Sequence, residues 1–134
     1  MRVIADTHAF YWYYRQPQLL SGAALATLHT ALVGGDGVVV SVATYMDLWY
    51  LVRKGGLPSV ALSHVWSLTQ YPGINVTAAA VTARIAERST SAPIDSLADP
   101  WDRFIVATAA VRGLPLITKD QPIADLGIVQ TIWG

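Results

Sequence analysis

The stretch Val38-Val39-Val40-Ser41, with the segment from Thr44 to Lys54 that follows it, decides the fold. Three consecutive valines are typical of a strand that is buried on both faces of a sheet. The segment from Thr44 to Lys54 has a helical pattern and ends at Gly55-Gly56, a common helix stop. A buried strand followed by a helix is a crossover unit, and crossovers of this kind join parallel strands. The stretch therefore predicts an α/β protein.

The same alternation of strand and helix extends in both directions along the chain. The patterns predict further strands at 2–5, 74–76, 115–118 and 128–132, and further helices at 21–33, 60–69, 78–88 and 100–111. Thr77 is expected to cap the helix 78–88, and Pro100 suits the first position of the last helix. We therefore expect a three-layer α/β/α sandwich with a mostly parallel central sheet. A length of 134 residues predicts one domain over 1–134.

Composition narrows the class of protein. The chain is 53% hydrophobic and 13% charged, with nine basic and nine acidic residues, so it is neither a disordered tail nor a strongly basic nucleic-acid binder. It has no cysteine, which excludes disulfides, thiolate zinc sites and a cysteine nucleophile. No apolar run reaches the roughly 18 residues of a spanning helix. We expect a cytoplasmic protein without a membrane partner, whose chemistry uses oxygen and basic nitrogen groups.

The apolar surplus and the aromatic residues point to a partner surface. Mean hydropathy is +0.40, which is high for a small monomer that must cover its surface with polar groups. Five aromatics follow one another from Phe10 to Tyr14, and on a helix they cannot all face the core. Exposed aromatics serve in protein interfaces or stack on unpaired bases. Trp49 and Tyr50 add to the apolar surplus, which favours a protein interface over base stacking. We therefore expect a homodimer.

Four aspartates fall at comparable places in this outline. Asp6 follows the first strand and Asp120 the fourth, while Asp47 and Asp102 lie early in two helices. Functional groups of open α/β sheets gather at the carboxyl ends of the strands, so these carboxylates are expected to converge at one edge. Their mutual repulsion is relieved by a hard divalent cation. Mg²⁺ or Mn²⁺ held by carboxylates and water polarises a phosphate and activates a water for hydrolysis.

Asp99 fits a second role better. It stands directly before Pro100 at the start of a helix, where aspartate is a natural N-cap. We therefore expect Asp99 to support the site by capping that helix rather than to bind a metal directly.

Four pieces of the sequence resemble, in order and spacing, the successive motifs of PIN-domain ribonucleases, above all the VapC-type toxins of bacterial and archaeal toxin–antitoxin pairs. They are Val3–His8, Ser41–Thr44 with Asp47, Asp99–Ala109 and Leu116–Asp120, and the likeness spans essentially the whole chain. The resemblance implies a PIN-like α/β/α fold and a metal-dependent endoribonuclease that uses Mg²⁺ or Mn²⁺. It also implies an RNA substrate and a cognate antitoxin that covers the site.

The resemblance assigns roles by motif position. Asp6, Asp102 and Asp120 match the metal-site aspartates of the family, Asp47 matches the remaining catalytic acid, and Thr118 matches a supporting hydroxyl residue. The family usually has glutamate where this chain has Asp47, which is one methylene shorter. A shortened acid reaches Mg²⁺ more readily through a water than directly, so weaker activity or a different metal preference is open.

Three further residues are candidate RNA contacts, namely Thr7, Arg103 and Lys119. Arg103 stands beside Asp102 and is equally suited to pairing with an acid. His8, two residues after Asp6, is close enough in sequence to approach the site, although a histidine near a strand end more often serves packing.

Other classes of protein remain as alternatives. A degenerate PIN domain would bind RNA or protein without cutting, which the Asp47 departure favours and the three retained acids argue against. A receiver-like signalling domain would need an adjacent acid pair after the first strand, but Thr7 follows Asp6. A phosphatase of the haloacid-dehalogenase type would need a second aspartate where His8 stands.

Overall fold

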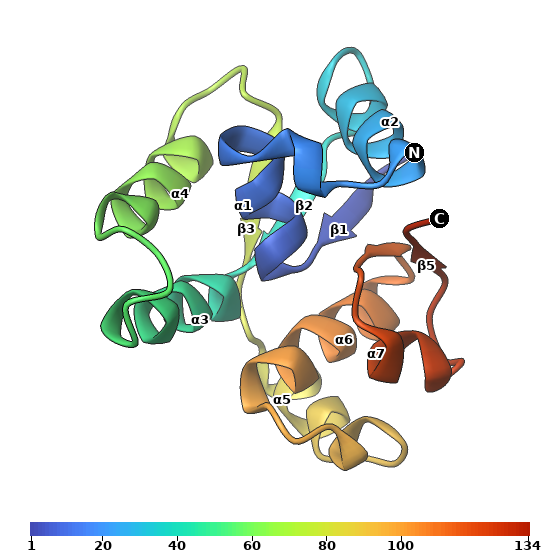
Figure 1. Cartoon of the computed structure of the whole chain (residues 1–134). Helices are drawn as coiled ribbons and strands as arrows, with labels where there is room; N and C mark the ends of the chain where they lie inside the picture. Colours follow the sequence, from blue (N-terminus) through green and yellow to red (C-terminus); the bar gives the residue numbers. More distant parts are fainter.

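A five-stranded parallel sheet forms the centre of the computed structural model, which describes residues 1–134 (Figure 1). Its strands are β1 (Val3–Ala5), β2 (Val38–Ser41), β3 (Val76–Ala79), β4 (Leu116–Ile117) and β5 (Thr131–Ile132). They lie in the order β3-β2-β1-β4-β5, and every neighbouring pair is parallel. The predicted α/β class with a mostly parallel sheet is confirmed.

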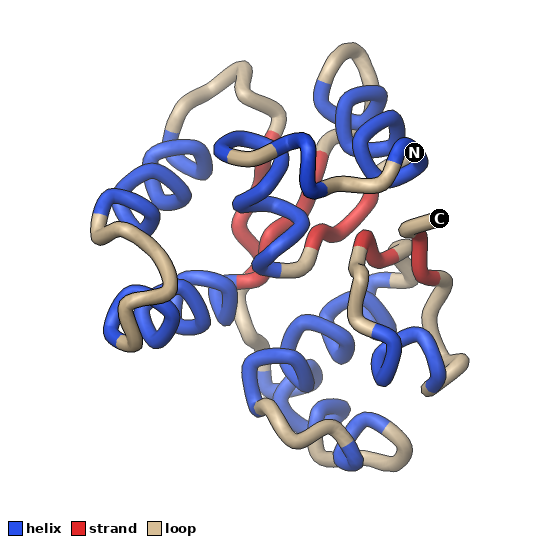
Figure 2. Tube along the Cα trace, in the orientation of Figure 1, coloured by secondary structure: helices blue, strands red, loops and turns tan.

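Helices cover both faces of this sheet (Figure 2). They are α1 (Thr7–Arg15), α2 (Gly22–Leu32), α3 (Val42–Arg53), α4 (Val60–Gln70), α5 (Ala83–Ser89), α6 (Pro100–Arg112) and α7 (Gln121–Asp125), with short 3₁₀ turns η1 (Pro17–Leu19) and η2 (Ile94–Ser96). None of these helices combines the length and the hydrophobicity that a membrane span requires.

Alternating strand residues explain the three layers. Val38 and Val40 belong to a buried cluster with side chains of α1, α2 and α4, whereas Val39 between them belongs to a second cluster with α5, α6 and α7. Side chains alternate between the two faces of a strand, so three consecutive valines supply apolar surface to both layers at once. The helices on either face are thereby held by burial of the same short strand.

The chain order creates a switch point between β1 and β4. The chain runs from β1 outward to β2 and β3, and then returns to the other side of β1 to form β4 and β5. The crevice at the carboxyl ends of the strands on either side of such a switch is the usual ligand site of an open parallel sheet. Ala5 pairs in register with Ile117, so Asp6 and Thr118, the next residues, are brought side by side.

The expected strand 74–76 and the expected cap at Thr77 are wrong. The strand is β3 at Val76–Ala79, where all four residues pair with β2, and the following helix α5 begins only after Thr82, whose side chain accepts a hydrogen bond from the Ile85 amide. Thr77 and Ala78 are exposed on this edge strand, so they lack the apolar pattern that marks a buried strand.

Other boundaries shift by less. Helix α3 begins at Val42, two residues earlier than expected, because Ser41 caps it by accepting a hydrogen bond from the Ala43 amide. Strand β5 is confined to Thr131–Ile132, the two residues that pair with β4, and does not extend back to residue 128. The segment between α5 and α6 includes the 3₁₀ turn η2.

Asn75 fixes the entry into β3 and replaces the strand residue that was expected there. Its backbone has a positive φ of 65°, and its side-chain amide donates to the carbonyl oxygens of Ala31 and Gly35 at 3.2 and 3.1 Å. Its own carbonyl accepts a hydrogen bond from the Val38 amide at 3.0 Å. Asn75 therefore ties the end of α2 to the beginnings of β2 and β3.

Two replacements of Asn75 separate the contribution of its side-chain hydrogen bonds from that of its positive φ. Asn75→Ala loses the side-chain hydrogen bonds and places a Cβ-bearing, non-amide residue at positive φ, so we expect the free energy of unfolding to fall by about 2 kcal/mol. Asn75→Gly keeps the backbone freedom, so we expect a loss of only about 1 kcal/mol. Urea unfolding measures both. Equal losses in the two variants would show that positive φ contributes nothing.

Candidate active site at the carboxyl edge of the sheet

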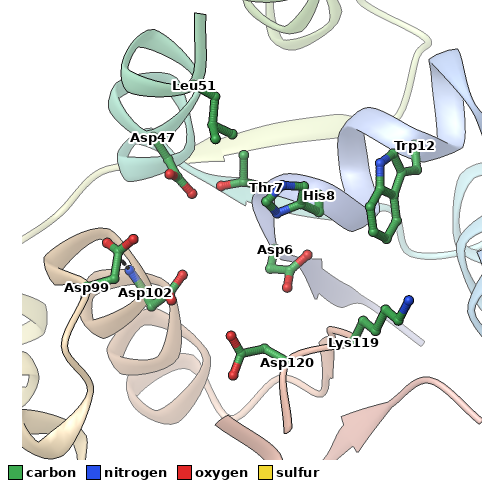
Figure 3. A pocket seen from close by; sticks show the side chains of 10 residues that line it. All are labelled: Asp6, Thr7, His8, Trp12, Asp47, Leu51, Asp99, Asp102, Lys119 and Asp120. Carbon is green, nitrogen blue, oxygen red and sulfur yellow. Dashed lines mark hydrogen bonds between the residues drawn. The ribbon is translucent and has the colours of Figure 1, made fainter. Parts of the chain in front are cut away.

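A cleft of about 450 Å³ opens at the carboxyl ends of β1 and β4 (Figure 3). Five of the nine acidic residues of the chain line it. The lining residues are Asp6, Thr7, His8, Trp12, Asp47, Leu51, Asp99, Asp102, Lys119 and Asp120. The sequence-based expectation that Asp6, Asp47, Asp102 and Asp120 converge at one edge of the sheet agrees with this lining.

Asp6 lies at the centre of the cleft and is held on both carboxylate oxygens. Its Oδ1 caps α1 by accepting a hydrogen bond from the Ala9 amide at 2.9 Å, and its Oδ2 accepts one from the Thr118 hydroxyl at 2.5 Å. The side chain is buried, and burial raises its pKa, while the hydrogen bonds from Thr118 and Ala9 act in the opposite direction. The fold therefore fixes this carboxylate in one orientation despite the cost of burying it.

Thr118 connects Asp6 with Asp120. Besides donating to Asp6, its hydroxyl oxygen accepts a hydrogen bond from the Asp120 amide at 3.1 Å. Asp120 in turn caps α7 by accepting from the Ile123 amide at 3.0 Å. The Thr118 side chain lies behind the acids and is buried, so it orients them without lining the cleft itself.

Asp99 and Asp102 reach the cleft from the first turn of α6. Asp99 caps this helix, as expected, with Oδ1 accepting from the Trp101 amide at 2.8 Å. Burial, together with repulsion from Asp99, Asp47, Asp120 and Asp6, raises the pKa of Asp102 to about 7. The pKa of Asp102 thus depends on all four other carboxylates of the cleft.

Asp47 faces these acids from the second turn of α3. Burial raises its pKa, the Thr7 hydroxyl opposes that shift, and the nearby Asp99 adds to it. Thr7 also contacts Thr44, with a hydroxyl-to-hydroxyl distance of 3.3 Å. Thr7 therefore links the start of α1 to α3 beside the acids.

Three helices begin at this cleft, each capped by an aspartate: α1 by Asp6, α6 by Asp99 and α7 by Asp120. The positive ends of the helix dipoles compensate part of the carboxylate charge. The only Lys or Arg that lines the cleft is Lys119, so five acids still leave it strongly negative.

This donor set fits a hard divalent cation. No group of three or more His, Asp or Glu side chains is arranged to hold one ion between them. Mg²⁺ at phosphate-processing sites commonly takes one or two carboxylates and completes its shell with water and phosphate oxygens. A cleft with five carboxylates and excess negative charge meets that requirement, and a zinc-type set of histidines and cysteines is absent.

The candidate RNA contacts differ in position. Thr7 and the exposed Lys119 line the cleft. Arg103 does not line it, because its guanidinium donates to the carbonyl oxygens of Leu97 at 2.7 Å and Ala98 at 3.2 Å. Arg103 braces the loop before α6, and it forms no ion pair with a carboxylate.

Sequence reasoning missed two residues of the cleft, Trp12 and Leu51, and gave His8 little weight. Trp12 and His8 are four residues apart on α1, so they share one helix face that follows directly from Asp6. That spacing was the available signal. It was hidden in the run of five aromatics, of which Phe10 and Tyr11 are buried and Trp12 is only partly covered.

The sequence as a whole identifies the family. Residues 3–129 match the family model of the PIN domain, and the chain belongs to this family.

Individual relatives agree with this assignment. The chain is 31% identical over 119 residues to Ribonuclease VapC22 of Mycobacterium tuberculosis, covering 89% of this chain and 87% of that protein. A crystal structure of M. tuberculosis VapC20, a sarcin–ricin loop cleaving toxin, shares the fold with a TM-score of 0.70 at 16% identity, covering 98% of this chain and 99% of that one. VapBC2 from Rickettsia felis, bound to promoter DNA, gives 0.68 at 14% identity, with 100% of both chains covered. The expected family is confirmed.

The raised pKa of Asp102 predicts a pH-dependent cost to stability in EDTA. Between its usual value of 3.8 and about 7, the folded protein retains a proton that the unfolded chain releases, so stability falls as pH rises through this window. The full difference corresponds to about 4 kcal/mol, which solvent screening at the open cleft reduces to about 1–2 kcal/mol. We expect Asp102→Asn to be more stable than wild type by that amount near pH 8, with a smaller difference near pH 5.

Urea unfolding across this pH range measures the effect. Asp95→Asn is the matched control, because Asp95 is exposed on η2 and does not line the cleft. A constant difference between wild type and Asp102→Asn from about pH 5 to 8 would contradict the assigned charge cost.

Proposed function

We propose that the chain is an endoribonuclease that hydrolyses RNA phosphodiester bonds with Mg²⁺ or Mn²⁺ and acts as the toxin of a type II toxin–antitoxin pair. The observation that carries the proposal is the gathering of five carboxylates at the switch point of a PIN-domain sheet. The relative named a ribonuclease, with 31% identity over most of both chains, supports the same activity.

The acids have distinct roles in this proposal. Asp6, Asp102 and Asp120 would hold the metal, directly or through water, and Asp47 would complete its shell. The bound cation would supply charge neutralisation of the phosphate and activation of a water. Thr118 positions Asp6 through its hydroxyl, and Asp99 keeps the first turn of α6 in place. Lys119 and Thr7 border the cleft where a phosphate backbone would enter.

Arg103 remains a candidate RNA contact only through its free N–H groups, because two of its donors are used on the loop before α6. Its substitution would first change the loop that leads to Asp99 and Asp102.

A binding-only PIN domain is a weaker explanation of the same residues. Asp6, Asp47 and Asp102 all have raised pKa values, so keeping them charged costs stability. That cost has a use where a cation and a phosphate must be bound together. A domain that only binds protein or RNA would gain nothing from it.

An exposed apolar patch on α3 supports a homodimer. Met46, Trp49 and Tyr50 lie on α3 and are 38%, 37% and 42% exposed. Residues three and four apart share one helix face, so they form a continuous apolar patch. We place a homodimer contact on this patch, and a cognate antitoxin as a second partner, since the related VapBC structures are toxin–antitoxin complexes.

The central prediction concerns cleavage. Purified wild type is expected to cut an end-labelled RNA with Mg²⁺ or Mn²⁺ and not in EDTA, and both Asp6→Asn and Asp102→Asn are expected to lower the rate by at least about 100-fold. Each change removes a carboxylate from the site but keeps the shape of the side chain. Gel analysis of the products measures the rate, and urea unfolding shows that both variants are folded. Undiminished cleavage by either variant would contradict the role assigned to that acid.

Asp47→Glu is the control within the same cleft. It restores the acid that is usual in the family and keeps the charge, so we expect cleavage to be retained or raised. Complete loss would mean that the position of α3 is fitted to the shorter aspartate. Asp95→Asn controls for charge removal outside the cleft.

The dimer is tested by sedimentation velocity. Wild type is expected to sediment as a dimer, and Trp49→Lys, which places a charge in the α3 patch, as a monomer. A monomeric wild type over the accessible concentration range would contradict the homodimer.

A further inference from the structure

The cleft has two chemically different sides. Figure 3 shows Asp47, Asp99 and Asp102 on one side, Trp12 and Lys119 on the other, and Asp6 between them. The carboxylates account for metal and phosphate chemistry, but they offer nothing that could contact a nucleobase face. On the side that carries Trp12, only Lys119 has a role in the proposed function.

Trp12 is held in a defined position. Its ring lies 5.3 Å from the His8 ring, one turn earlier on α1, and its edge-to-face neighbour Trp133 is 6.1 Å away. The Trp133 carbonyl accepts a hydrogen bond from the Ser21 hydroxyl, which attaches the C-terminal segment to the start of α2. Contacts from two parts of the chain thus fix the indole, and it still lines the open cleft.

Lys119 adds a cation to this aromatic surface. Its ammonium nitrogen lies 6.0 Å from the centre of the Trp12 ring, and its side chain is exposed. Lys119 directly precedes Asp120, so the same loop after β4 brings the cation and a carboxylate of the reaction centre to the cleft.

Core packing accounts for only part of this arrangement, because Trp12 packs against the buried cluster with part of its side chain and lines the cleft with the rest. On the same helix Phe10 and Tyr11 are 1% and 5% exposed and belong to the core, whereas Trp12 faces a polar cleft. An indole and an ammonium side by side match the two parts of a nucleotide, because bases stack on aromatic rings and phosphates bind cations.

We propose that Trp12 is a specificity-determining residue on which one nucleobase next to the cleaved bond stacks, while Lys119 binds a neighbouring phosphate. The inference rests on the proposed RNA cleavage and adds to it the form of the substrate. A base within a duplex has both faces covered by its neighbours, so the nucleotide on Trp12 must be unpaired. We therefore expect that RNA in which the base at this position stays paired in a helix is not a substrate.

Three variants test Trp12. Trp12→Leu removes the stacking surface, Trp12→Phe keeps an aromatic ring, and Trp66→Leu is the matched control, because Trp66 is 53% exposed on α4 and lies outside the cleft. Stacking contributes enough per base for an expected loss in kcat/KM of about tenfold in Trp12→Leu. We expect Trp12→Phe to recover most of it and Trp66→Leu to match wild type. Melting temperatures establish that each variant is folded.

Abasic substrates separate stacking from a general structural role. Once wild-type cut sites in a structured RNA are mapped, oligoribonucleotides spanning one site are made with a single abasic ribose at each flanking position. Wild type is expected to lose about tenfold at one position. Trp12→Leu is expected to cut that abasic RNA and the intact RNA equally well. Equal cutting of all the RNAs by wild type overturns the inference. So does a Trp12→Leu variant whose rate falls below that of wild type by the same factor on intact and on abasic RNA.

Binding gives a readout without cleavage. Fluorescence anisotropy of the same labelled oligonucleotides is measured on Asp102→Asn, with and without Trp12→Leu. A preference for the intact over the abasic RNA that disappears with Trp12→Leu supports base stacking on Trp12, even if no RNA is cut and the proposed nuclease fails. Equal binding of intact and abasic RNA overturns base stacking on Trp12 and leaves the proposed nuclease unaffected. Absence of RNA binding altogether also overturns base stacking on Trp12.

Discussion

The parallel pairing of β1 with β4 is the constraint on which the site depends. Because Ala5 pairs with Ile117, the next residue of each strand emerges at the same edge, and the Thr118 hydroxyl meets the Asp6 carboxylate. Buried strand side chains and ladder hydrogen bonds hold this pairing, so the sheet brings together acids that would separate on their own. The helices α1 and α7 start at that edge for the same reason, each capped by the aspartate that leaves the strand.

Charge balance in the cleft explains why so few basic residues are needed. Burial and mutual repulsion raise the pKa values of Asp6, Asp47 and Asp102, while the starts of three helices direct partial positive charge toward the same space. The divalent cation of the proposed function would neutralise the remaining excess of negative charge. A chain with no net charge would in this way attract a phosphate locally, although it has no bulk attraction for nucleic acid.

The sequence predicts the parts of this structure that depend on local chemistry. Strand-terminal aspartates, the Asp99 cap and the valine strand follow from rules that act over a few residues. Strand β3 was misplaced because Thr77 and Ala78 lie exposed at an edge, where no apolar pattern marks a strand. The hydrogen bonds of Arg103 depend on the conformation of the loop just before α6, which no sequence pattern specifies. The place of Trp12 in the cleft depends on how distant segments pack. Five consecutive aromatics conceal the one whose ring reaches the site.

Helix α1 couples the two sides of the cleft. Asp6 caps its first turn and Trp12 lies in its second, so one rigid element sets the distance between the central carboxylate and the indole. Thr7 ties the start of this helix to α3 through Thr44, and Trp133 contacts it from the C-terminal segment. A shift of α1 would therefore displace the Asp6 carboxylate and the Trp12 ring together. Geometry that joins them this tightly suits a site in which recognition of one base and placement of the adjacent phosphate are a single event.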